Sequence, residues 1–267
     1  MTRTGRRGSP AAPLQIGATV IAVHHSSAAL HAAGLPGPQG VYKRALRRWY
    51  RRAYLEVDAV MSVIDPGPDS SRLRTVPLRL GLGPEFHPRP HVQRGDHVLY
   101  VGRLSREKGL RELLEATAAA GSDWRLVMRG TGPAGDTLRE RARQLGVQRR
   151  VSFEPYTGDR DELARVYAQA RCVALPGPHE TFGLVALEAA ACGTPVVTAE
   201  STPSVALIGE FVQTFRAGDA ADLLRAIERA RIQGQDLGAA AALAERTGWD
   251  AALSAELADL ERLAGRR

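Results

Sequence analysis

Two glutamates, Glu180 and Glu188, stand eight positions apart in a segment that predicts a loop followed by a helix. Gly183 and Leu184 open this predicted helix. The free N–H groups and the positive dipole end of a helix N-terminus suit a phosphate. Glu180 lies before this terminus and Glu188 lies about two turns into the helix. The pattern therefore fits a ligand with hydroxyls on both sides of a phosphate, and a nucleotide sugar has that layout.

Other interpretations of the glutamate pair remain open at this point. A glycosidase acid/base pair would need carboxyl groups roughly 5–10 Å apart, and no aromatic sugar platform lies nearby in the sequence. No His or Asp at helical spacing joins the pair, so no metal site is expected. Glu180 could also simply cap the helix that follows it.

Basic residues follow the first of a series of predicted strands. The segment Gly102–Gly109 contains Arg103 and Lys108. Arginine can donate two parallel hydrogen bonds to a phosphate, and lysine supplies a compact charge. Together they could neutralise a diphosphate leaving group, although either residue alone could belong to a surface salt bridge.

The next two predicted strands also end in residues that could contact a ligand. Gly130 and Gly132 would allow a ligand to approach the backbone, or would only form a turn. Phe153 and Glu154 end the third strand, where an aromatic ring and exposed backbone could hold a base. Packing of Phe153 in the core is the alternative.

The chain has 267 residues and a formal net charge of +7, which favours anionic partners. Part of this charge lies in Lys43–Arg52, where arginines repeat at helical spacing around Trp49 and Tyr50. This segment could contact a membrane surface or an acidic partner, or form a solvated helix face. No nucleic-acid-binding pattern accompanies the charge, so nucleic acid is not an expected partner.

Two cysteines, Cys172 and Cys192, have no metal-site spacing and fit a reducing compartment. No apolar run reaches the roughly 18–20 residues that span a bilayer, and no signal-peptide pattern opens the chain. The expected location is cytoplasmic, with peripheral membrane contact as an option.

Strand and helix patterns alternate from Val98 onward, which predicts a parallel, doubly wound α/β sheet. Strands are predicted at 98–101, 125–128, 151–153, 172–175, 195–198 and 212–215, with helices at 110–114, 138–145, 163–170, 184–191, 219–232 and 239–263. Before this region, short strands are expected only at 19–23, 59–64 and 76–78. The predicted organisation is a flexible tail at 1–14, an incomplete N-terminal Rossmann-like portion with a linker at 15–90, a complete Rossmann-like domain at 91–245 and a C-terminal helix at 246–267.

Taken together, these motifs resemble the retaining GT-B glycosyltransferases of family 4. The matching motifs are Gly102-Arg103-Leu104, Lys108-Gly109, Gly130-x-Gly132, the aromatic Phe153, and Glu180-x7-Glu188 running into Gly193-x-Pro195-Val196-Val197. They occur in the family's order, and the resemblance covers about Val98 to Leu263. It implies a GT-B-like fold, a UDP- or GDP-sugar as co-substrate, an acceptor that the sequence does not identify, and neither a cofactor nor a metal.

The resemblance also implies roles for individual residues. Arg103 and Lys108 would bind the donor diphosphate, and Glu180 would hydrogen-bond the donor sugar. Glu188 would hold the ribose hydroxyls, and His24 resembles the active-site histidine of the family. The remaining donor-binding residues that we expect are Gly102, Gly130, Gly132, Phe153, Glu154, Phe182, Gly183 and Leu184.

The chain departs from the family pattern in its first part and in two loops. The opening half of the N-terminal domain is missing, Pro176-Gly177-Pro178 replaces the family's serine before the first glutamate, and Glu200–Ser204 lacks the family's glycines and glutamate. The sequence therefore predicts a hexosyltransferase-type retaining glycosyltransferase. The alternative is a glycosyltransferase-like protein that binds only the donor nucleotide, or that needs a partner chain to complete its N-terminal domain.

Overall fold

A computed structural model describes residues 20–24, 38–63, 74–120, 124–178, 180 and 182–265. The chain divides into two compact units, described separately below: a first unit of residues 1–78 with 259–267, and a second unit of residues 79–258. The predicted tail at 1–14 lies outside the described residues.

The second unit is built on a six-stranded sheet in which all strands are parallel. Its spatial order is β6-β5-β4-β7-β8-β9. The strands are β4 (His97–Val101), β5 (Arg125–Arg129), β6 (Val151–Glu154), β7 (Cys172–Leu175), β8 (Val196–Ala199) and β9 (Val212–Phe215). These bounds agree with the predicted strands to within one residue at each end. The predicted parallel α/β sheet is confirmed.

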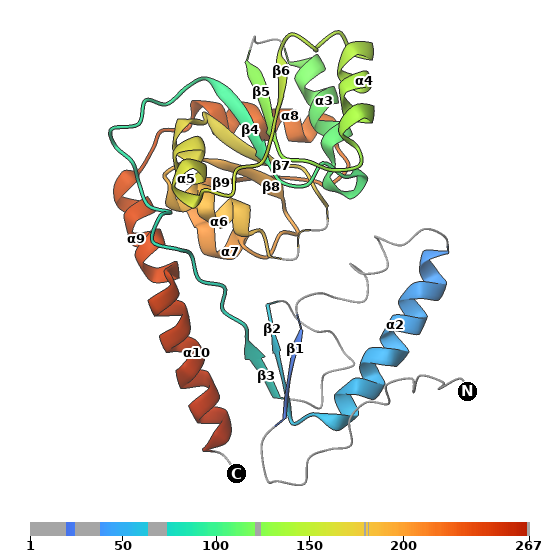
Figure 1. Cartoon of the computed structure of the whole chain (residues 1–267), viewed down its shortest axis with the longest axis vertical. Coiled ribbons are helices and arrows are strands. Elements are labelled where there is room, and N and C mark those ends of the chain that lie inside the picture. Colours follow the sequence, from blue (N-terminus) through green and yellow to red (C-terminus); the bar gives the residue numbers. More distant parts are fainter. Residues whose placement is uncertain are drawn as a thin grey trace, which may run out of the picture. The chain divides into compact units, whose positions relative to one another are not determined.

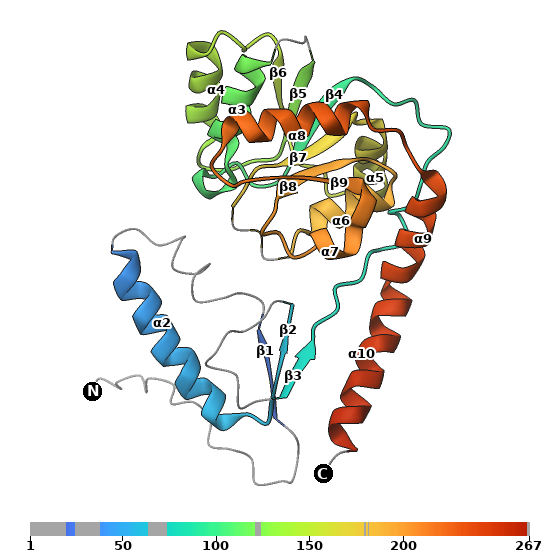
Figure 2. The same ribbon diagram turned by 180° about the vertical axis from the view of Figure 1, so that it is seen from behind.

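Helices cover both faces of this sheet. One face carries α3 (Leu110–Ala119), α4 (Gly135–Gln144) and α8 (Ala220–Ile232), which Figure 2 shows in front. The other face carries α5 (Arg160–Gln169), α6 (Leu184–Ala191) and the short α7 (Val205–Ile208), as Figure 1 shows. Single turns of 3-10 helix lie at η3 (Arg106–Lys108) and η4 (Gly209–Phe211). Every residue of β7 and β8 is buried, because both faces of these central strands are covered.

The predicted single helix over residues 239–263 is wrong in one respect. The structure has two helices, α9 (Leu237–Thr247) and α10 (Trp249–Ala264), separated by Gly248. The Leu82 amide donates to the Thr247 carbonyl at 2.8 Å, and the Trp249 amide donates to the Leu82 carbonyl at 3.0 Å. The backbone of a distant segment therefore interrupts the helix at Gly248.

The division between the units also falls earlier than the predicted boundary after residue 90. It lies between Leu78 and Arg79. Leu82 and Phe86, placed in the linker by the sequence, are 2% and 1% exposed in the core of the second unit. Their apolar side chains hold the segment against this core, so it belongs to the second unit.

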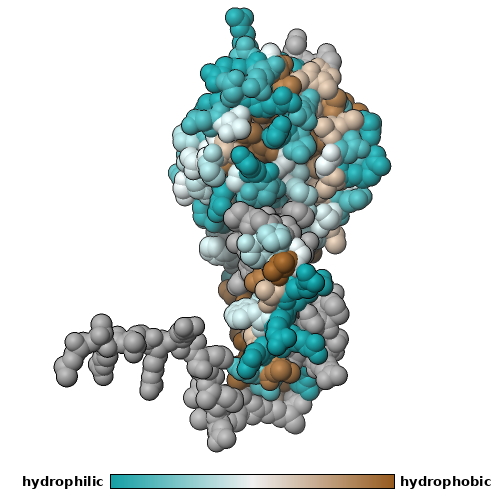
Figure 3. Space-filling view, turned by 90° about the vertical axis from the view of Figure 1, so that its right-hand side faces the viewer, coloured by the Kyte–Doolittle hydropathy of each residue, from teal (hydrophilic) through white to brown (hydrophobic). Residues whose placement is uncertain are grey.

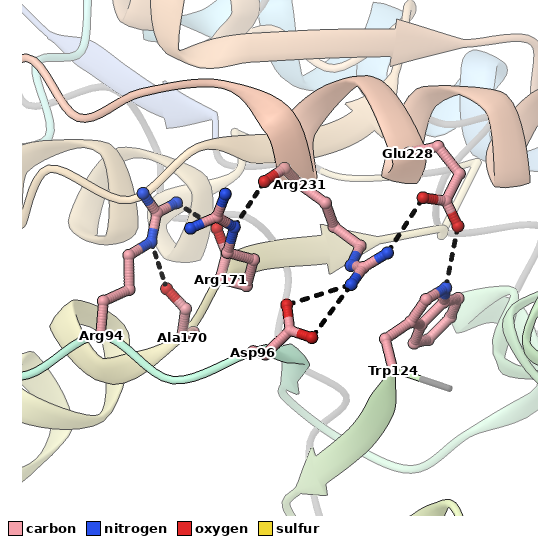
Figure 4. A network of polar contacts seen from close by, with 7 residues as sticks. All are labelled: Arg94, Asp96, Trp124, Ala170, Arg171, Glu228 and Arg231. Atoms are coloured by element: carbon pink, nitrogen blue, oxygen red, sulfur yellow. Dashed lines mark hydrogen bonds and ion pairs between the residues drawn. The ribbon is translucent and has the colours of Figure 1, made fainter. Parts of the chain in front are cut away.

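The amino ends of the strands are joined by a network of arginines (Figure 4). Arg94 donates to the Ala170 carbonyl at 3.1 Å and also to the Arg171 carbonyl. Arg231 pairs with Asp96 and Glu228, each at 3.0 Å, and the Trp124 indole donates to Glu228 at 3.0 Å. Burial and the neighbouring Arg171 lower the pKa of Arg94 to about 10. This network ties helix ends to strand starts, at the edge opposite the candidate site.

The first unit contains a parallel sheet in the order β1-β2-β3, with β1 (Ile21–His24), β2 (Ala59–Ser62) and β3 (Arg74–Pro77). The basic segment forms α2 (Gln39–Ala53), followed by the turn η1 (Tyr54–Glu56). A small core gathers Ala59, Met61, Val76 and Leu263. The predicted strand at 59–64 is shorter, because it ends at Ser62, and Ile64 lies outside the described residues.

Candidate functional site

The candidate site lies at the carboxyl edge of the six-stranded sheet, where the strand order reverses. The chain leaves β4 toward β5 and β6 on one side, and places β7, β8 and β9 on the other side. In open α/β sheets, ligands bind outside the carboxyl ends of the strands at such a switch point. The loops after β4 and β7 flank this point, and they carry the basic motif and the first glutamate of the pair.

Lys108 and Glu180 meet directly across the switch point. The Lys108 Nζ atom lies 2.7 Å from Glu180 Oε1, and their side chains are 26% and 18% exposed. Gly109 adopts φ 65° against the Pro176 carbonyl, which a Cβ atom at this position would approach to 2.5 Å. A glycine is therefore required where the two loops pack together. The structure thus brings together two of the residues to which the sequence assigned donor contacts.

Two predicted glycines line a pocket at the carboxyl ends of β4 and β5. A Cβ atom on Gly130 would lie 1.9 Å from the Gly102 carbonyl oxygen, and one on Gly132 would lie 2.3 Å from that of Leu104. The loops after β4 and β5 are therefore packed backbone against backbone. The pocket has a volume of 440 Å³ and is lined by Gly102, Arg103, Gly130, Thr131, Gly132, Pro133 and Tyr156.

Arg103 is exposed and lies at this pocket. Its guanidinium forms no ion pair within the described ranges, so a ligand anion could reach it. Its backbone is fixed, because the hydroxyl of the buried Tyr100 donates to the Arg103 carbonyl at 2.8 Å. Burial raises the pKa of Tyr100, and this tyrosine therefore stays a hydrogen-bond donor at neutral pH.

The N-terminus of α6 begins where the sequence predicted it. Gly183 precedes the helix with φ 88°, and a Cβ atom at this position would lie 2.5 Å from the hydroxyl of the buried Ser204. No described side chain caps the helix, so its first N–H groups can take an anion. Phe182 packs against the core and Leu184 is exposed. The neighbouring His179 and Thr181 lie outside the described residues.

Glu188 lies on α6 and is half-buried. Its Oε2 atom accepts a hydrogen bond of 2.8 Å from the hydroxyl of Tyr167 on α5. Burial raises the pKa of Glu188, and the hydrogen bond from Tyr167 partly opposes this effect. The carboxylate is therefore held in place by one oxygen atom.

Phe153 packs against the core, and Glu154 forms an ion pair. Phe153 is half-buried against the core, with the Arg139 guanidinium 4.9 Å from its ring centre. Glu154 pairs at 2.8 Å with Arg129, which also pairs at 2.9 Å with Glu162. Neither predicted residue lines the pocket, and their donor-binding roles remain predictions.

Three residues that the sequence did not assign to the site help to build it. Tyr156 supplies the aromatic ring at the pocket, Arg129 holds Glu154 and Glu162, and Tyr167 holds Glu188. Tyr156 lies two residues after the predicted strand-end pair, so its position was a usable signal. Contacts of the other two depend on side chains far apart in the sequence, which spacing alone does not reveal.

His24 ends β1 in the first unit, where its backbone pairs with that of Ser62. Its predicted active-site role stays a prediction, and the adjacent His25 lies outside the described residues.

Among the residues that the structure covers, no group of three or more His, Cys, Asp or Glu side chains could hold a metal ion. None of the described helices is long and apolar enough to cross a membrane.

Solved structures with the same architecture are glycosyltransferases of the GT-B type. Sucrose-phosphate synthase from Thermosynechococcus elongatus superposes with a TM-score of 0.74 at 21% identity, over 92% of this chain and 68% of that one. The Anabaena protein HepE, solved in complex with UDP and glucose, gives 0.70 at 19% identity, over 92% and 72% of the two chains. The fold is therefore GT-B-like, as the sequence predicted.

Sequence similarity places the chain within a family of this class. The family Glycosyl transferases group 1 matches residues 85–241, more than half of the chain, and the protein belongs to this family. The predicted resemblance is thus confirmed.

Curated relatives in this family have named activities. A GDP-mannose-dependent alpha-(1-6)-phosphatidylinositol dimannoside mannosyltransferase from Mycobacterium tuberculosis is 39% identical over 146 residues, 50% of this chain and 37% of the relative. A D-inositol 3-phosphate glycosyltransferase from a Mycobacterium species is 46% identical over 148 residues, 52% of this chain and 31% of the relative. The aligned part therefore spans about a third of the length of these relatives.

Proposed function

We propose that this protein transfers a glycosyl group from a nucleoside-diphosphate sugar to an acceptor with retention of configuration. The observation that carries the proposal is the Lys108–Glu180 ion pair at the switch point. Lys108 lies on the loop that also gives Gly102 and Arg103 to the glycine-lined pocket, and Glu180 lies on the loop that leads to the N-terminus of α6. Cationic, backbone N–H and carboxylate groups then lie on neighbouring loops at this edge of the sheet, as a sugar diphosphate requires.

The nucleotide is proposed to lie along the carboxyl edge of the sheet. Its diphosphate would accept hydrogen bonds from Arg103, Lys108 and the N-terminus of α6, each of which favours negative charge. Glu188 would accept hydrogen bonds from the ribose hydroxyls. Lysine has three donor hydrogens, so Lys108 can contact the diphosphate and Glu180 together, while Glu180 accepts from hydroxyls of the sugar.

In the proposed reaction, the bond between the sugar C1 atom and the diphosphate oxygen breaks, and a bond from the acceptor oxygen to C1 forms on the same face. The acceptor proton passes to the departing diphosphate oxygen. Negative charge grows on that diphosphate, so Arg103 and Lys108 stabilise the transition state more than the ground state. The protein side chains then need to supply little acid or base chemistry.

The experiment has a binding step and a transfer step. UDP, GDP and their sugars are added to the full chain, and the melting temperature is followed, since a ligand that binds only the folded state raises it. Glu188→Ala and Lys108→Ala should each reduce the shift. The absence of a shift with every nucleotide would refute donor binding.

Transfer is then measured by mass spectrometry with GDP-mannose and UDP-glucose as donors. Inositol phosphate and phosphatidylinositol mannosides are tested as acceptors, because relatives in the family are named for such substrates. A product with retained configuration supports the proposal. Binding without any turnover would instead support the alternative of a donor-binding protein that needs a partner chain.

We also propose that α2 lets the protein contact an anionic membrane surface. The helix contains no acidic residue between Gln39 and Ala53, and its arginines at 44, 47, 48, 51 and 52 are all exposed. Hydrophilic surface runs along this helix in Figure 3. Beside the arginines lies an apolar strip of Val41, Ala45 and Trp49, and Trp49 is 64% exposed. Arginines flanking an exposed tryptophan are typical of helices that lie in a lipid headgroup region.

Vesicle sedimentation tests this second proposal. A basic residue near an anionic surface contributes about 1 kcal/mol, so Arg48→Ala with Arg52→Ala should weaken binding to phosphatidylglycerol vesicles roughly 30-fold. Arg111→Ala with Arg149→Ala removes two exposed arginines from the second unit and should have little effect. An equal loss of vesicle binding in the two double variants, or self-association of the chain in place of vesicle binding, would refute this proposal.

A further inference from the structure

Tyr167 is a core tyrosine whose hydroxyl points at Glu188, the residue expected to bind the ribose. Its side chain is fully buried on α5, next to Phe86, with the two ring centres 6.1 Å apart. The hydroxyl of Thr194 donates to the Tyr167 carbonyl at 2.7 Å, so the backbone is held as well. The Tyr167 hydroxyl lies 2.8 Å from Glu188 Oε2. The position of this phenol is therefore set by the core and not by the ligand.

The direction of this hydrogen bond is fixed. Burial raises the pKa of Tyr167 well above its ordinary value, and the charge of Glu188 raises it further. The phenol therefore stays protonated and donates, while the carboxylate accepts. A hydrogen bond to an ionised group is stronger than one between neutral groups, and a buried hydroxyl without a partner would be costly.

The hydrogen bond from Tyr167 occupies only one of the two oxygen atoms of the Glu188 carboxylate, which leaves the other for a ligand. Glu188 Oε1 accepts no hydrogen bond from any residue that the structure describes, and the side chain is only half-buried. Arg160 is the other group whose charge acts on this carboxylate. A free glutamate side chain loses up to about 2 kcal/mol of rotamer entropy on ordering. Tyr167 orders this side chain before any ligand arrives, which lowers the cost of binding.

We propose that Tyr167 is a positioning residue for the donor, and that it fixes Glu188 so that the carboxylate accepts hydrogen bonds from the ribose diol. The inference rests on the proposed function, because it needs a nucleotide at this edge of the sheet. Tyr167 itself does not touch the ligand. Its effect on binding passes through Glu188 and depends on the ribose hydroxyls.

The test compares UDP and GDP with their 2′,3′-dideoxy analogues by calorimetry. Tyr167→Phe removes one oxygen atom and keeps the ring. We expect this variant to bind the ribonucleotide about tenfold more weakly, which corresponds to about 1.4 kcal/mol. Binding of the dideoxy analogue should change less than twofold, because it has no diol for Glu188 to hold.

Tyr100→Phe is the matched control. Tyr100 is also buried and also donates a hydrogen bond from its hydroxyl, but to the Arg103 carbonyl. Its loss should affect the ribonucleotide and the dideoxy analogue equally. If Tyr167→Phe also weakens both ligands equally, or weakens neither, Tyr167 has only a structural role and the inference is refuted.

If Tyr167→Phe alone does not fold, the same substitution is tested in the Glu188→Gln variant. Glu188→Gln removes the carboxylate charge, and adding Tyr167→Phe to it should change nucleotide affinity less than twofold. A further large loss in this background would show that Tyr167 acts independently of Glu188. If the wild-type chain binds no nucleotide, the proposed function fails as well; if it binds and only the coupling is missing, the proposed function stands and this inference alone fails.

Discussion

Replacement of Lys108 by methionine tests the ion pair at the switch point. Methionine keeps an unbranched side chain and removes the charge that lies 2.7 Å from Glu180 Oε1. In the ligand-free protein, Glu180 is then left without its partner while only 18% of its side chain is exposed. The expected loss of stability is about 1–2 kcal/mol, between the values for exposed and buried pairs.

The effect on nucleotide binding is expected to be larger. Two unit charges 4 Å apart attract with about 4 kcal/mol at an effective dielectric constant of 20. A hydrogen bond to a charged group contributes about 1.5–3 kcal/mol net. With about 2 kcal/mol lost, the dissociation constant for UDP or GDP rises roughly 30-fold.

Thermal melting and calorimetry measure both effects. A nucleotide at 100 times its dissociation constant stabilises the wild type by about 2.7 kcal/mol, or roughly 5–11 °C for a domain of this size. At the same concentration Lys108→Met should gain only about 0.9 kcal/mol, or roughly 2–4 °C.

Two further variants separate charge at the site from charge in general. Arg106→Met removes an exposed cation from the same turn, η3, and should bind nucleotide within twofold of the wild type. Lys108→Met with Glu180→Gln should regain stability without regaining affinity. If Lys108→Met binds nucleotide as the wild type does, the ion pair has no part in donor binding and the reasoning is wrong.

Three further predictions concern other residues of the second unit. Burial raises the pKa of Glu188 above its ordinary value of 4.5, so its charge opposes folding at higher pH. Glu188→Gln should therefore melt higher than the wild type at pH 7 but not at pH 4, while binding nucleotide more weakly; equal melting at pH 7 would contradict this. Gly130→Ala places a Cβ atom 1.9 Å from the Gly102 carbonyl and should cost about 3 kcal/mol in urea unfolding; a loss below about 1 kcal/mol would show that the loops separate easily. Hydrogen bonds from Thr157 and Arg129 lower the pKa of Glu162. The charged carboxylate therefore stabilises the folded state above pH 4.5, and this stabilisation is lost as the pH falls. Arg129→Met should therefore reduce the acid-induced fall in melting temperature, and an unchanged acid profile would count against this role.

The sequence predicted the second unit well because its signals are local. Strands buried on both faces read as continuous apolar runs, as in Cys172–Leu175, whose predicted bounds are those of β7. The helix Leu184–Ala191 likewise has its predicted bounds. The single helix predicted over residues 239–263 is wrong at Gly248, because the break between α9 and α10 depends on hydrogen bonds with Leu82, far away in the sequence.

The sequence by itself determined the alternation of strands and helices, the family, and which strand ends carry glycines, cations and carboxylates. Residue types and local periodicity are enough for these conclusions. Only the tertiary structure decided which of these groups meet: Lys108 with Glu180, Tyr167 with Glu188, and Arg129 with Glu154. Such pairs depend on strand order and on the packing of side chains between helices. These are properties of the folded sheet, and spacing along the chain does not encode them in a form that can be read directly.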